Sequence, residues 1–261
     1  MHVVLTIAGS DSGGGAGIQA DLKTFSAHQV FGTSVLTAVT AQNTRGVQGV
    51  EALSGDIVEA QMRSVLSDFD VAAAKTGMLF SAEIIERVVE VAREFPLPNL
   101  VVDPVMVATS GDRLLQEEAV EFLLHRLMPL ARVVTPNLVE AEILTGRALC
   151  TLDDARAAAR ALHEATGAGV VVKGGHRLES ATDVFFDGRE FHEYQAPLLK
   201  TSAGHGTGCT FSAALAAQLG RGCDLPEAIQ RAKEYVYAAL LAAPRLGHGR
   251  GPLNHNVPAR L

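Results

Sequence analysis

Short apolar runs separated by helical stretches occupy most of the 261 residues, and this alternation is the strongest constraint on the fold. The first run, VVLTIA at residues 3–8, is almost continuously apolar and ends at Gly9, which is typical of a strand buried on both faces of a parallel sheet. Similar runs predict further strands at residues 35–41, 72–75, 100–103, 132–135 and 169–173. Helical periodicity predicts helices at residues 18–29, 57–69, 82–95, 117–127, 138–144, 153–166 and 225–241.

One departure from this alternation comes late in the chain. Residues 183–186 and 190–194 flank Asp187-Gly188, a dipeptide typical of a tight hairpin turn. The whole pattern predicts an α/β fold with a mainly parallel central sheet, helices on both faces and a late β-hairpin, formed as a single domain over residues 1–261.

Polar or glycine-rich residues follow the predicted strands. In a mainly parallel sheet, ligands bind at the edge where the carboxyl ends of the strands meet. The breaks that we expect to converge there are residues 9–17, Gln42, Met78, Asp103, Asn137 and Lys173. The first of them, GSDSGGGAG, is expected to be too flexible for regular structure.

Charge and composition exclude several classes of protein. With 22 Lys and Arg against 29 Asp and Glu, the net charge of −7 gives no indication of a nucleic-acid or anionic-membrane partner. No apolar stretch approaches membrane-spanning length, and no signal-peptide pattern is visible. Cys150, Cys209 and Cys223 are too few for a disulfide framework and odd in number, so a reducing cytoplasm is expected.

The segment at residues 200–217, KTSAGHGTGCTFSAALAA, places three alternating glycines directly before a strongly helical run. Gly204, Gly206 and Gly208 allow a ligand to approach the main chain closely. Because the first N–H groups of a helix lack partners and its dipole is positive there, this entrance predicts an anion site, most naturally for a phosphate. Gly-Lys-Ser/Thr is absent, so it is not a Walker A loop. The alternative is a glycine-rich turn that only starts a core helix.

Cys209 lies at the first turn of that helix. The field of the helix start is expected to lower the pKa of its thiol and to favour chemistry, although a buried structural cysteine is the alternative. A thiol hydrolase that pairs Cys209 with His205 is disfavoured, because the spacing gives poor geometry and no third orienting group is apparent.

Seven motifs in fixed order carry a resemblance to a known family. They are AGSDSGGGAGIQAD, TAQNT, KTGM, DPVMVATSG, TPNLVEAE, VKGGH and GHGTGCTFSAA. In these the chain resembles the ribokinase-like superfamily, and within it the hydroxymethylpyrimidine/phosphomethylpyrimidine kinase branch of thiamin biosynthesis. The resemblance covers essentially the whole chain. It implies Mg²⁺-dependent phosphoryl transfer from ATP to a hydroxymethyl group on a pyrimidine, and then a second transfer onto the monophosphate.

Phosphoryl transfer depends mainly on positioning and charge neutralisation. The backbone N–H groups of Gly206, Thr207, Gly208 and Cys209 are expected to neutralise charge on the transferring group. Cys209 occupies the position where most sugar kinases of the superfamily carry an aspartate base. The helix start would lower the pKa of this thiol and a nearby triphosphate would raise it, so we expect a partly ionised thiol that accepts the hydroxyl proton.

Asp103 and Glu140 are the predicted Mg²⁺ site, directly or through water, because this hard ion prefers oxygen ligands. Asn137 and Glu140 match the superfamily's Asn-x-x-Glu pattern. From the residues alone, Asn137 could equally be a helix cap and Glu140 a solvated first-turn carboxylate.

Nucleotide phosphates are expected to contact Lys173, Thr207 and, more weakly, Lys233. The alternatives are a solvated rim lysine for Lys173 and the polar face of the last helix for Lys233.

The ring substrate is expected to be recognised by Gln42, whose amide offers a donor beside an acceptor. Gly9, Asp21 and Met78 are expected to line the same pocket, with core packing as the alternative for Met78 and helix surface for Asp21. His205 is a candidate phosphate contact or a loop residue without a role. His248 and His255, in the glycine-rich tail, have no evident partner in the sequence. As a partner we also expect a second copy of the chain, in a homodimer.

Two rival activities remain at this point. A pyridoxal kinase of the same superfamily would also act on a flat ring that bears a hydroxymethyl group. A dinucleotide-dependent oxidoreductase is suggested by GAGIQA at residues 15–20, which fits G-x-G-x-x-A. The oxidoreductase is disfavoured because the motif starts well after the strand and the second strand ends in Gln42-Asn43 instead of an acidic residue.

Overall fold

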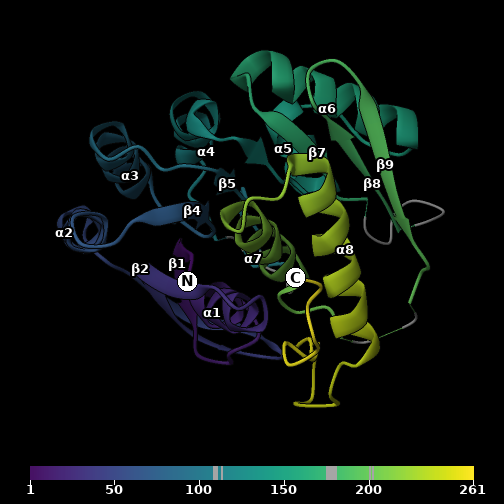
Figure 1. Ribbon diagram of the computed structural model, residues 1–261, viewed down its shortest axis with the longest axis horizontal. Helices are drawn as coiled ribbons and strands as arrows, with labels where there is room; N and C mark the ends of the chain where they lie inside the picture. Colours follow the sequence, from purple (N-terminus) through teal and green to yellow (C-terminus); the bar gives the residue numbers. More distant parts are fainter. Residues whose placement is uncertain (108–110, 113, 175–180, 200, 202) are drawn as a thin grey trace.

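The computed structural model describes residues 1–107, 111, 112, 114–174, 181–199, 201 and 203–261. Its strands are β1 (Val3–Asp11), β2 (Phe31–Asn43), β3 (Gly46–Ala52), β4 (Val71–Thr76), β5 (Leu100–Val102), β6 (Val133–Val134), β7 (Gly169–Val172), β8 (Ala181–Phe186) and β9 (Phe191–Ala196). All of them join one nine-stranded sheet in the order β3-β2-β1-β4-β5-β6-β7-β8-β9 (Figure 1).

The α-helices are α1 (Gly17–Ala27), α2 (Gly55–Leu66), α3 (Ala82–Glu94), α4 (Ala119–Phe122), α5 (Leu138–Thr145), α6 (Leu152–Thr166), α7 (Thr207–Gly220) and α8 (Leu225–Leu241). A π-helical turn, η1 (Leu123–Leu127), and a 3₁₀ turn, η2 (Met128–Leu130), follow α4. Residues 117–127, predicted as one helix, are therefore a short α-helix that continues with π geometry. In the part of the chain that the structure describes, no helix has the length and apolar character needed to cross a bilayer.

The central strands pair in parallel, from β2 through β1, β4, β5 and β6 to β7. β8 runs antiparallel to β7, and β9 antiparallel to β8, which confirms the predicted late hairpin. The antiparallel edge strand β3 is not among the predicted strands. Its sequence, GVQGVEA, contains two glycines and two polar residues, and its residues are half-buried or exposed, so it lacks a continuous apolar run.

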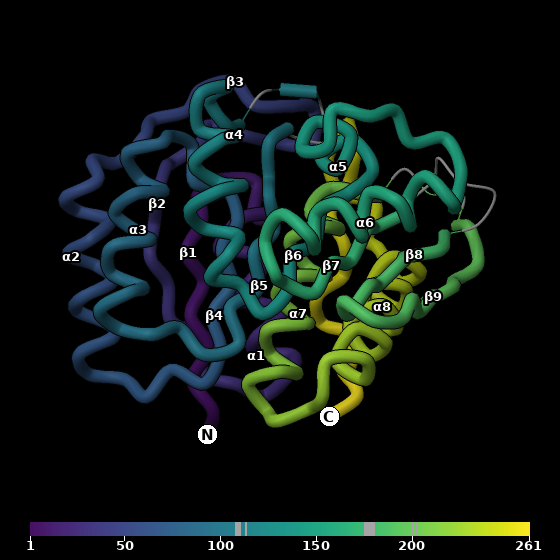
Figure 2. Tube along the Cα trace, turned by 90° about the horizontal axis from the view of Figure 1, so that it is seen from above, coloured from purple at the N-terminus to yellow at the C-terminus, as the bar shows by residue number. Residues whose placement is uncertain are grey.

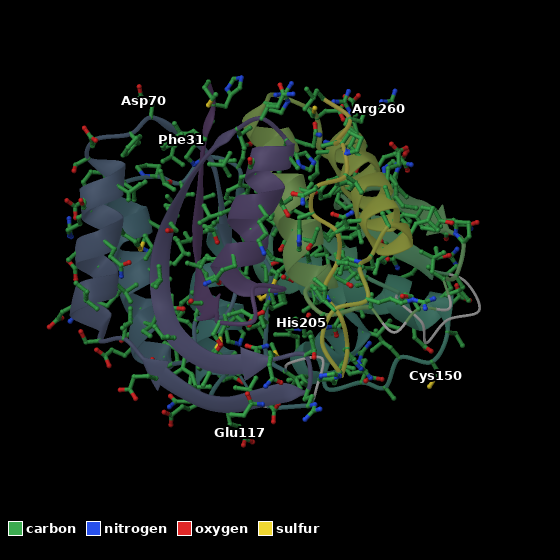
Figure 3. All side chains as sticks on the ribbon, turned by 90° about the horizontal axis from the view of Figure 1, so that it is seen from below. Phe31, Asp70, Glu117, Cys150, His205 and Arg260 are labelled. Atoms are coloured by element: carbon green, nitrogen blue, oxygen red, sulfur yellow. The ribbon has the colours of Figure 1, made fainter. Side chains whose placement is uncertain are left out.

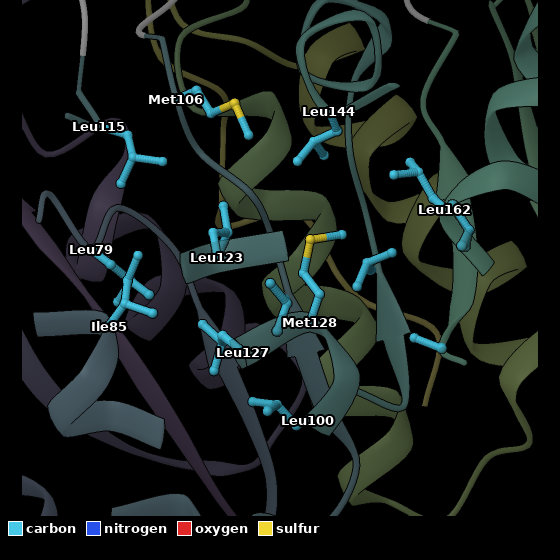
Figure 4. Packing of buried hydrophobic residues seen from close by; sticks show 14 of the residues in the cluster. Leu79, Ile85, Leu100, Met106, Leu115, Leu123, Leu127, Met128, Leu144 and Leu162 are labelled. Carbon is cyan, nitrogen blue, oxygen red and sulfur yellow. The ribbon is translucent and has the colours of Figure 1, made fainter. Parts of the chain in front are cut away.

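Helices cover both faces of the sheet, as predicted. Side chains alternate along the strands, so Leu100 and Val102 of β5 enter one core and Val101 enters the other. The first core is closed by helices α2–α6, and Figure 4 shows part of it around Leu100 and Leu127. The second core is closed by α1, α7 and α8. The predicted mainly parallel α/β architecture is confirmed.

Helix α7 runs through the middle of the second core, and its residues from Thr210 to Gly220 are all buried. Small side chains allow this, since a Cβ added at Gly220 would meet Val4 Cγ2 at 3.0 Å. In Figure 2, β1 begins beside the N-terminus, and β3 lies on the opposite side of the molecule, to which the carboxyl ends of the parallel strands point. The amino end of α7 faces this same carboxyl edge, because Gly208 is close to Asp103 at the end of β5.

The first strand is longer than its sequence indicates. Residues 9–11, predicted to begin an irregular loop, continue β1 to Asp11. A register shift between Ala8 and Ser10 accommodates the extension against β2. Two of the motifs fall partly outside the described residues: Ala108, Thr109 and Ser110 of DPVMVATSG, and Gly175 and His176 of VKGGH.

Candidate active site

Two neighbouring cavities lie at the carboxyl edge of the sheet. The first has a volume of about 120 Å³ and the second of about 280 Å³. Asn137, Lys173 and Gly208 line both cavities. The strand-end breaks Gly9, Gln42, Met78, Asp103, Asn137 and Lys173 all line the first, so the predicted convergence on one cleft is confirmed.

The glycine-rich loop places the start of α7 between the two cavities. Gly206 caps the helix with φ 85° and ψ 9°, a left-handed conformation that favours glycine. A Cβ at this position would lie 1.8 Å from Gly15 O, so the close approach of the two loops also requires glycine. The N–H groups of Gly208 and Cys209 have no acceptor one turn earlier in α7, and that of Thr207 donates only a long hydrogen bond, 3.4 Å, to Gly204 O. The arrangement is an anion site with a positive helix end.

Asp103 and Lys173 form an ion pair next to Gly208 of this loop. Lys173 Nζ is 2.8 Å from Asp103 Oδ1, and a Cβ at Gly208 would lie only 3.2 Å from the same ammonium. Thr135 and Ser212 donate hydroxyl hydrogen bonds to Asp103, each at 3.1 Å. Burial raises the pKa of Asp103, but the charges of Lys173 and Lys75 outweigh burial and hold it below its ordinary value.

Asn137 and Glu140 form a capping box at the start of α5. Asn137 Oδ1 accepts from the Glu140 backbone N–H at 3.0 Å, and Glu140 Oε2 accepts from the Asn137 backbone N–H at 2.8 Å. Asn137 is thus a helix cap as well as a cavity residue. Glu140 is only 4% exposed, so the alternative of a solvated carboxylate is wrong. Burial raises the pKa of Glu140 to about 7, with Lys173 opposing the shift and Asp103 adding to it.

The pair Asp103 and Glu140 suits a magnesium ion that keeps part of its water shell. Both carboxylates line the first cavity, and the raised pKa of Glu140 reflects burial near a second negative group that a divalent cation would relieve. Among the described residues there is no group of three or more His, Cys, Asp or Glu that could hold a metal. The site therefore fits Mg²⁺ bound through one or two carboxylates and phosphates, and not a metal held by a full set of protein ligands.

Cys209 differs from the expectation of a partly ionised thiol. Burial raises its pKa to about 11, and the nearby ammonium of Lys75 and the hydrogen bond from the Gly17 backbone do not offset burial. The helix-start effect therefore does not prevail at this position. In the ligand-free protein the thiol is neutral at physiological pH.

Asp21 does not line the cavity as predicted, because its side chain is completely buried. Lys75 Nζ lies 2.9 Å from Asp21 Oδ2, and Thr6 Oγ1 donates to the same oxygen at 2.6 Å. Lys75 was not singled out, although it stands in the KTGM motif. A Cβ at Gly77 would lie 2.7 Å from its Nζ, so this ammonium lies directly beneath the segment that carries Met78.

Gln42 and Met78 border the ring-sized space of the first cavity. Thr40 Oγ1 lies 3.0 Å from Gln42 Oε1 and 2.9 Å from Ser10 O, so these two acceptors share its one hydrogen at the end of β2. A Cβ at Gly9 would meet Met78 Sδ at 3.1 Å, so Gly9 makes room for the methionine, which is itself 7% exposed.

The second cavity combines charged and apolar walls. Lys233 is 8% exposed and its Nζ lies 2.7 Å from Asp183 Oδ2, so it is not on the polar face of α8 as the alternative proposed. Lys173 lines both cavities, whereas Thr207 lines the second. The apolar lining includes Phe211, Val236 and Leu240.

Asp11 and His205 are brought together from opposite ends of the chain. His205 Nε2 lies 2.7 Å from Asp11 Oδ2, and both residues line the first cavity. Figure 3 shows His205 well inside the outline of the molecule, whereas Cys150 lies at its margin. Asp11 is not among the predicted site residues, because residues 9–17 are expected to be flexible. The available signal was an aspartate two residues before a run of glycines, where it can accept several backbone N–H groups.

The two histidines of the C-terminal tail contact α7 and the residue that follows β2. His255 Nε2 lies 2.9 Å from Thr210 Oγ1, in the first turns of α7. The backbone N–H of His248 donates to Thr44 Oγ1, just beyond β2.

The sequence is similar to those of known kinases. A family model described as phosphomethylpyrimidine kinase matches residues 11–254. The chain is 55% identical over 258 residues to the hydroxymethylpyrimidine/phosphomethylpyrimidine kinase of Rhizobium meliloti (strain 1021), covering 97% of this chain and 96% of the relative.

Solved structures are also similar. Phosphomethylpyrimidine kinase from Clostridium difficile 630 has 42% identity and a TM-score of 0.82, covering 92% of this chain and 99% of the other. An ADP complex of Bacillus subtilis pyridoxal kinase has 41% identity and a TM-score of 0.90, covering 98% and 97%.

Proposed function

Because the chain belongs to the phosphomethylpyrimidine kinase family, we propose that it phosphorylates 4-amino-5-hydroxymethyl-2-methylpyrimidine with ATP, first to the monophosphate and then to the diphosphate, in thiamin biosynthesis. One observation carries this proposal. The amino end of α7 lies in the wall between two cavities, because Gly208 lines both. An acceptor in one cavity and a nucleotide in the other would therefore present their reacting groups to the same N–H groups.

The pyrimidine would occupy the first cavity. Gln42 offers an amide donor and acceptor to a ring nitrogen and its neighbouring amino group, and Thr40 Oγ1 lies 3.0 Å from the amide oxygen. Gly9 and Met78 form a flat apolar wall, which suits a ring face. Asp21 acts from below the cavity, where its carboxylate neutralises Lys75.

The nucleotide would occupy the second cavity. Its apolar lining by Phe211, Val236 and Leu240 suits a base, and Lys173 and Thr207 stand where the phosphates would enter the shared wall. Lys233 contributes positive charge to the same cavity, partly neutralised by Asp183.

Transfer of the phosphoryl group would rely on fixed donors. The N–H groups of Gly206, Thr207, Gly208 and Cys209, at the start of α7, would donate to the charge that develops on the transferring group, and such donors need no reorganisation during the reaction. Cys209 accepts the hydroxyl proton through the small fraction of thiolate that its high pKa leaves. Lys173 neutralises charge on the opposite side of the loop.

Asp103 and Glu140 would hold Mg²⁺, in part through its water molecules. When bound, the ion neutralises phosphate charge and orients the nucleotide. The capping box keeps the Glu140 carboxylate directed to the cavity, and the hydroxyls of Thr135 and Ser212 fix the Asp103 carboxylate.

Pyridoxal phosphorylation is the second candidate, because pyridoxal kinase of Bacillus subtilis shares this fold at a TM-score of 0.90. We also propose that the chain forms one domain and a homodimer and acts in the cytoplasm. The free cysteines Cys150, Cys209 and Cys223 are in keeping with a reducing compartment.

A coupled assay tests the proposal directly. The purified protein is incubated with Mg²⁺, ATP and either the hydroxymethylpyrimidine or pyridoxal, and the products are separated by anion exchange. We expect monophosphate and then diphosphate of the pyrimidine, with a higher kcat/KM than for pyridoxal. The reverse preference would replace the first candidate by the second, and no transfer to either ring would overturn both.

A further inference from the structure

Asp11 occupies the end of β1, and both oxygens of its carboxylate are used. Oδ1 accepts the backbone N–H of Gly13 at 2.7 Å, while Oδ2 accepts those of Gly15 at 3.0 Å and Ala16 at 2.8 Å. The carboxylate is 3% exposed. This carboxylate therefore binds three backbone N–H groups of the first glycine-rich loop, residues 13–16, and the Lys23 ammonium donates to Gly14 O of the same loop at 2.6 Å.

The same Oδ2 also accepts from His205, at 2.7 Å. This contact joins residues 194 positions apart, and the imidazole is 12% exposed. Burial raises the pKa of Asp11, but His205 and the backbone N–H groups outweigh it and hold that pKa below its ordinary value. Asp11 is therefore an acceptor, and the proton in this contact is on His205 Nε2.

His205 directly precedes the residues that form the anion site. The next residue, Gly206, passes so close to Gly15 O that no side chain could be accommodated there. A displacement of His205 would therefore move the N–H groups of Thr207, Gly208 and Cys209 relative to the first cavity. A misplacement of about 1 Å in a phosphoryl-transfer site can cost about a hundredfold in rate.

We propose that Asp11 and His205 form a positioning pair that fixes the anion loop, residues 204–209, relative to the first cavity as phosphoryl transfer requires, an inference that rests on the proposed kinase function. The pair does not hold the fold together. The backbone N–H groups of Gly204 and His205 also donate to Gly251 O, at 3.2 and 3.3 Å, so the loop stays attached to the C-terminal segment without the imidazole. The pair instead sets where the loop lies relative to β1.

The test compares His205→Ala with His205→Gln, because glutamine places an amide N–H at about the reach of Nε2. His248→Ala is the matched control, since in the described contacts His248 uses its backbone N–H. For each protein we measure kcat with the hydroxymethylpyrimidine, the Kd of ADP, and the Kd of ADP with aluminium fluoride, Mg²⁺ and the same pyrimidine. The fluoride complex imitates the phosphoryl group in transit.

We expect His205→Ala to lower kcat about a hundredfold and to weaken the aluminium fluoride complex by a similar factor, with the Kd of ADP changed by less than about twofold. His205→Gln should recover at least about tenfold of the lost kcat, and His248→Ala should match the wild type.

A kcat for His205→Ala within about threefold of an active wild type would overturn the positioning pair alone. Equal weakening of ADP and of its fluoride complex would also overturn it, because that outcome indicates general disorder of the loop. A wild-type protein without kinase activity would overturn the proposed function, and the pair's role with it.

Discussion

Lys75 and Cys209 lie near each other in the site, but only Lys75 is charged at neutral pH. Lys75 is completely buried, and the pairing with Asp21 keeps it charged although burial favours its neutral form. Cys209 receives the charge of Lys75 and a hydrogen bond from the Gly17 backbone, but burial outweighs both and raises its pKa to about 11. The thiolate that would accept a proton is therefore a minor species at neutral pH. The rates of transfer to the hydroxymethyl group and to the monophosphate should therefore depend differently on pH.

The pH profile of the two transfers tests this difference. At pH 7 about one thiol in ten thousand is ionised when the pKa is about 11. With the hydroxymethyl acceptor, kcat should rise about tenfold per pH unit between pH 7 and 9. With the monophosphate acceptor the profile should be nearly flat, because a phosphate monoester is already doubly ionised above its second pKa of about 6.

Cys209→Ala should abolish the rise of kcat with pH in the first transfer and lower that kcat by about a hundredfold or more at pH 9. The same substitution should affect the second transfer much less. Single-turnover quench experiments from pH 7 to 9 measure both. If the alanine variant keeps the slope and the rate of the first transfer, Cys209 is not the proton acceptor.

At the scale of elements, α5 shows that one local motif can serve both structure and chemistry. The capping box begins the helix and also directs the Glu140 carboxylate into the first cavity. A pKa of about 7 means that this carboxylate changes charge within the working range of the protein. Because Mg²⁺ binds the ionised form, its affinity should fall as the pH drops through 7.

The magnesium dependence of turnover tests the role of Glu140. Between pH 8 and pH 6 the ionised fraction falls about tenfold for a pKa near 7, so the half-saturating Mg²⁺ concentration should rise about tenfold. Glu140→Gln keeps an oxygen for the Asn137 N–H, so α5 should remain capped while the half-saturating concentration rises and loses most of its pH dependence.

Glu164→Gln, an exposed position on α6, is the control and should behave as the wild type. An unchanged Mg²⁺ requirement in Glu140→Gln would remove Glu140 from the metal site.

Sequence periodicity predicted the central strands and most helices because each of these elements buries a continuous face. Residues 100–102 form an uninterrupted apolar run that ends at Asp103, and such a short run predicts a buried strand. The edge strand β3 is not predicted, because its residues are exposed or half-buried and polar residues are tolerated there. The π-helical turn at Leu123–Leu127 has no recognised signal in the sequence.

The candidate site was predictable where a residue lies at or just after the carboxyl end of a strand. Gln42, Asp103 and Lys173 meet as expected, because parallel strands share one carboxyl edge. Asp21 was misplaced, since helical periodicity gives the face of a helix but not the residue opposite, here Lys75 from a strand 54 positions away. The thiol pKa of Cys209 could not be predicted, because it depends on how deeply the helix start is buried.

At the scale of the whole molecule, the contacts of α1 with α8 join the first and last thirds of the chain. His28, at the end of α1, is completely buried and lies edge-on to Tyr235 of α8, with ring centroids 4.6 Å apart. Nδ1 lies 2.8 Å from Thr24 O and must carry the proton, because a carbonyl only accepts. Nε2 is therefore unprotonated in the neutral ring, and it has no hydrogen-bond partner among the described residues.

Acid should weaken the fold through this ring. Burial lowers the pKa of His28 to about 4, against 6.5 for an ordinary histidine, so between these values the unfolded chain binds a proton that the folded chain does not. Stability must then fall as the pH drops from about 6.5 towards 4, by about 2 kcal/mol at pH 5 for this residue. Glu140 acts in the opposite direction, since its raised pKa makes the folded state the better proton acceptor.

His28→Phe isolates the effect, because the phenyl ring can pack on Tyr235 but does not titrate. Urea unfolding at pH 7 and pH 5 gives the free energy of unfolding for both proteins, and all groups other than His28 contribute equally to each. The wild type should lose about 2 kcal/mol more than the variant over this interval. Equal losses would mean that His28 takes up a proton in the folded protein, and that the contact between α1 and α8 tolerates a charged ring.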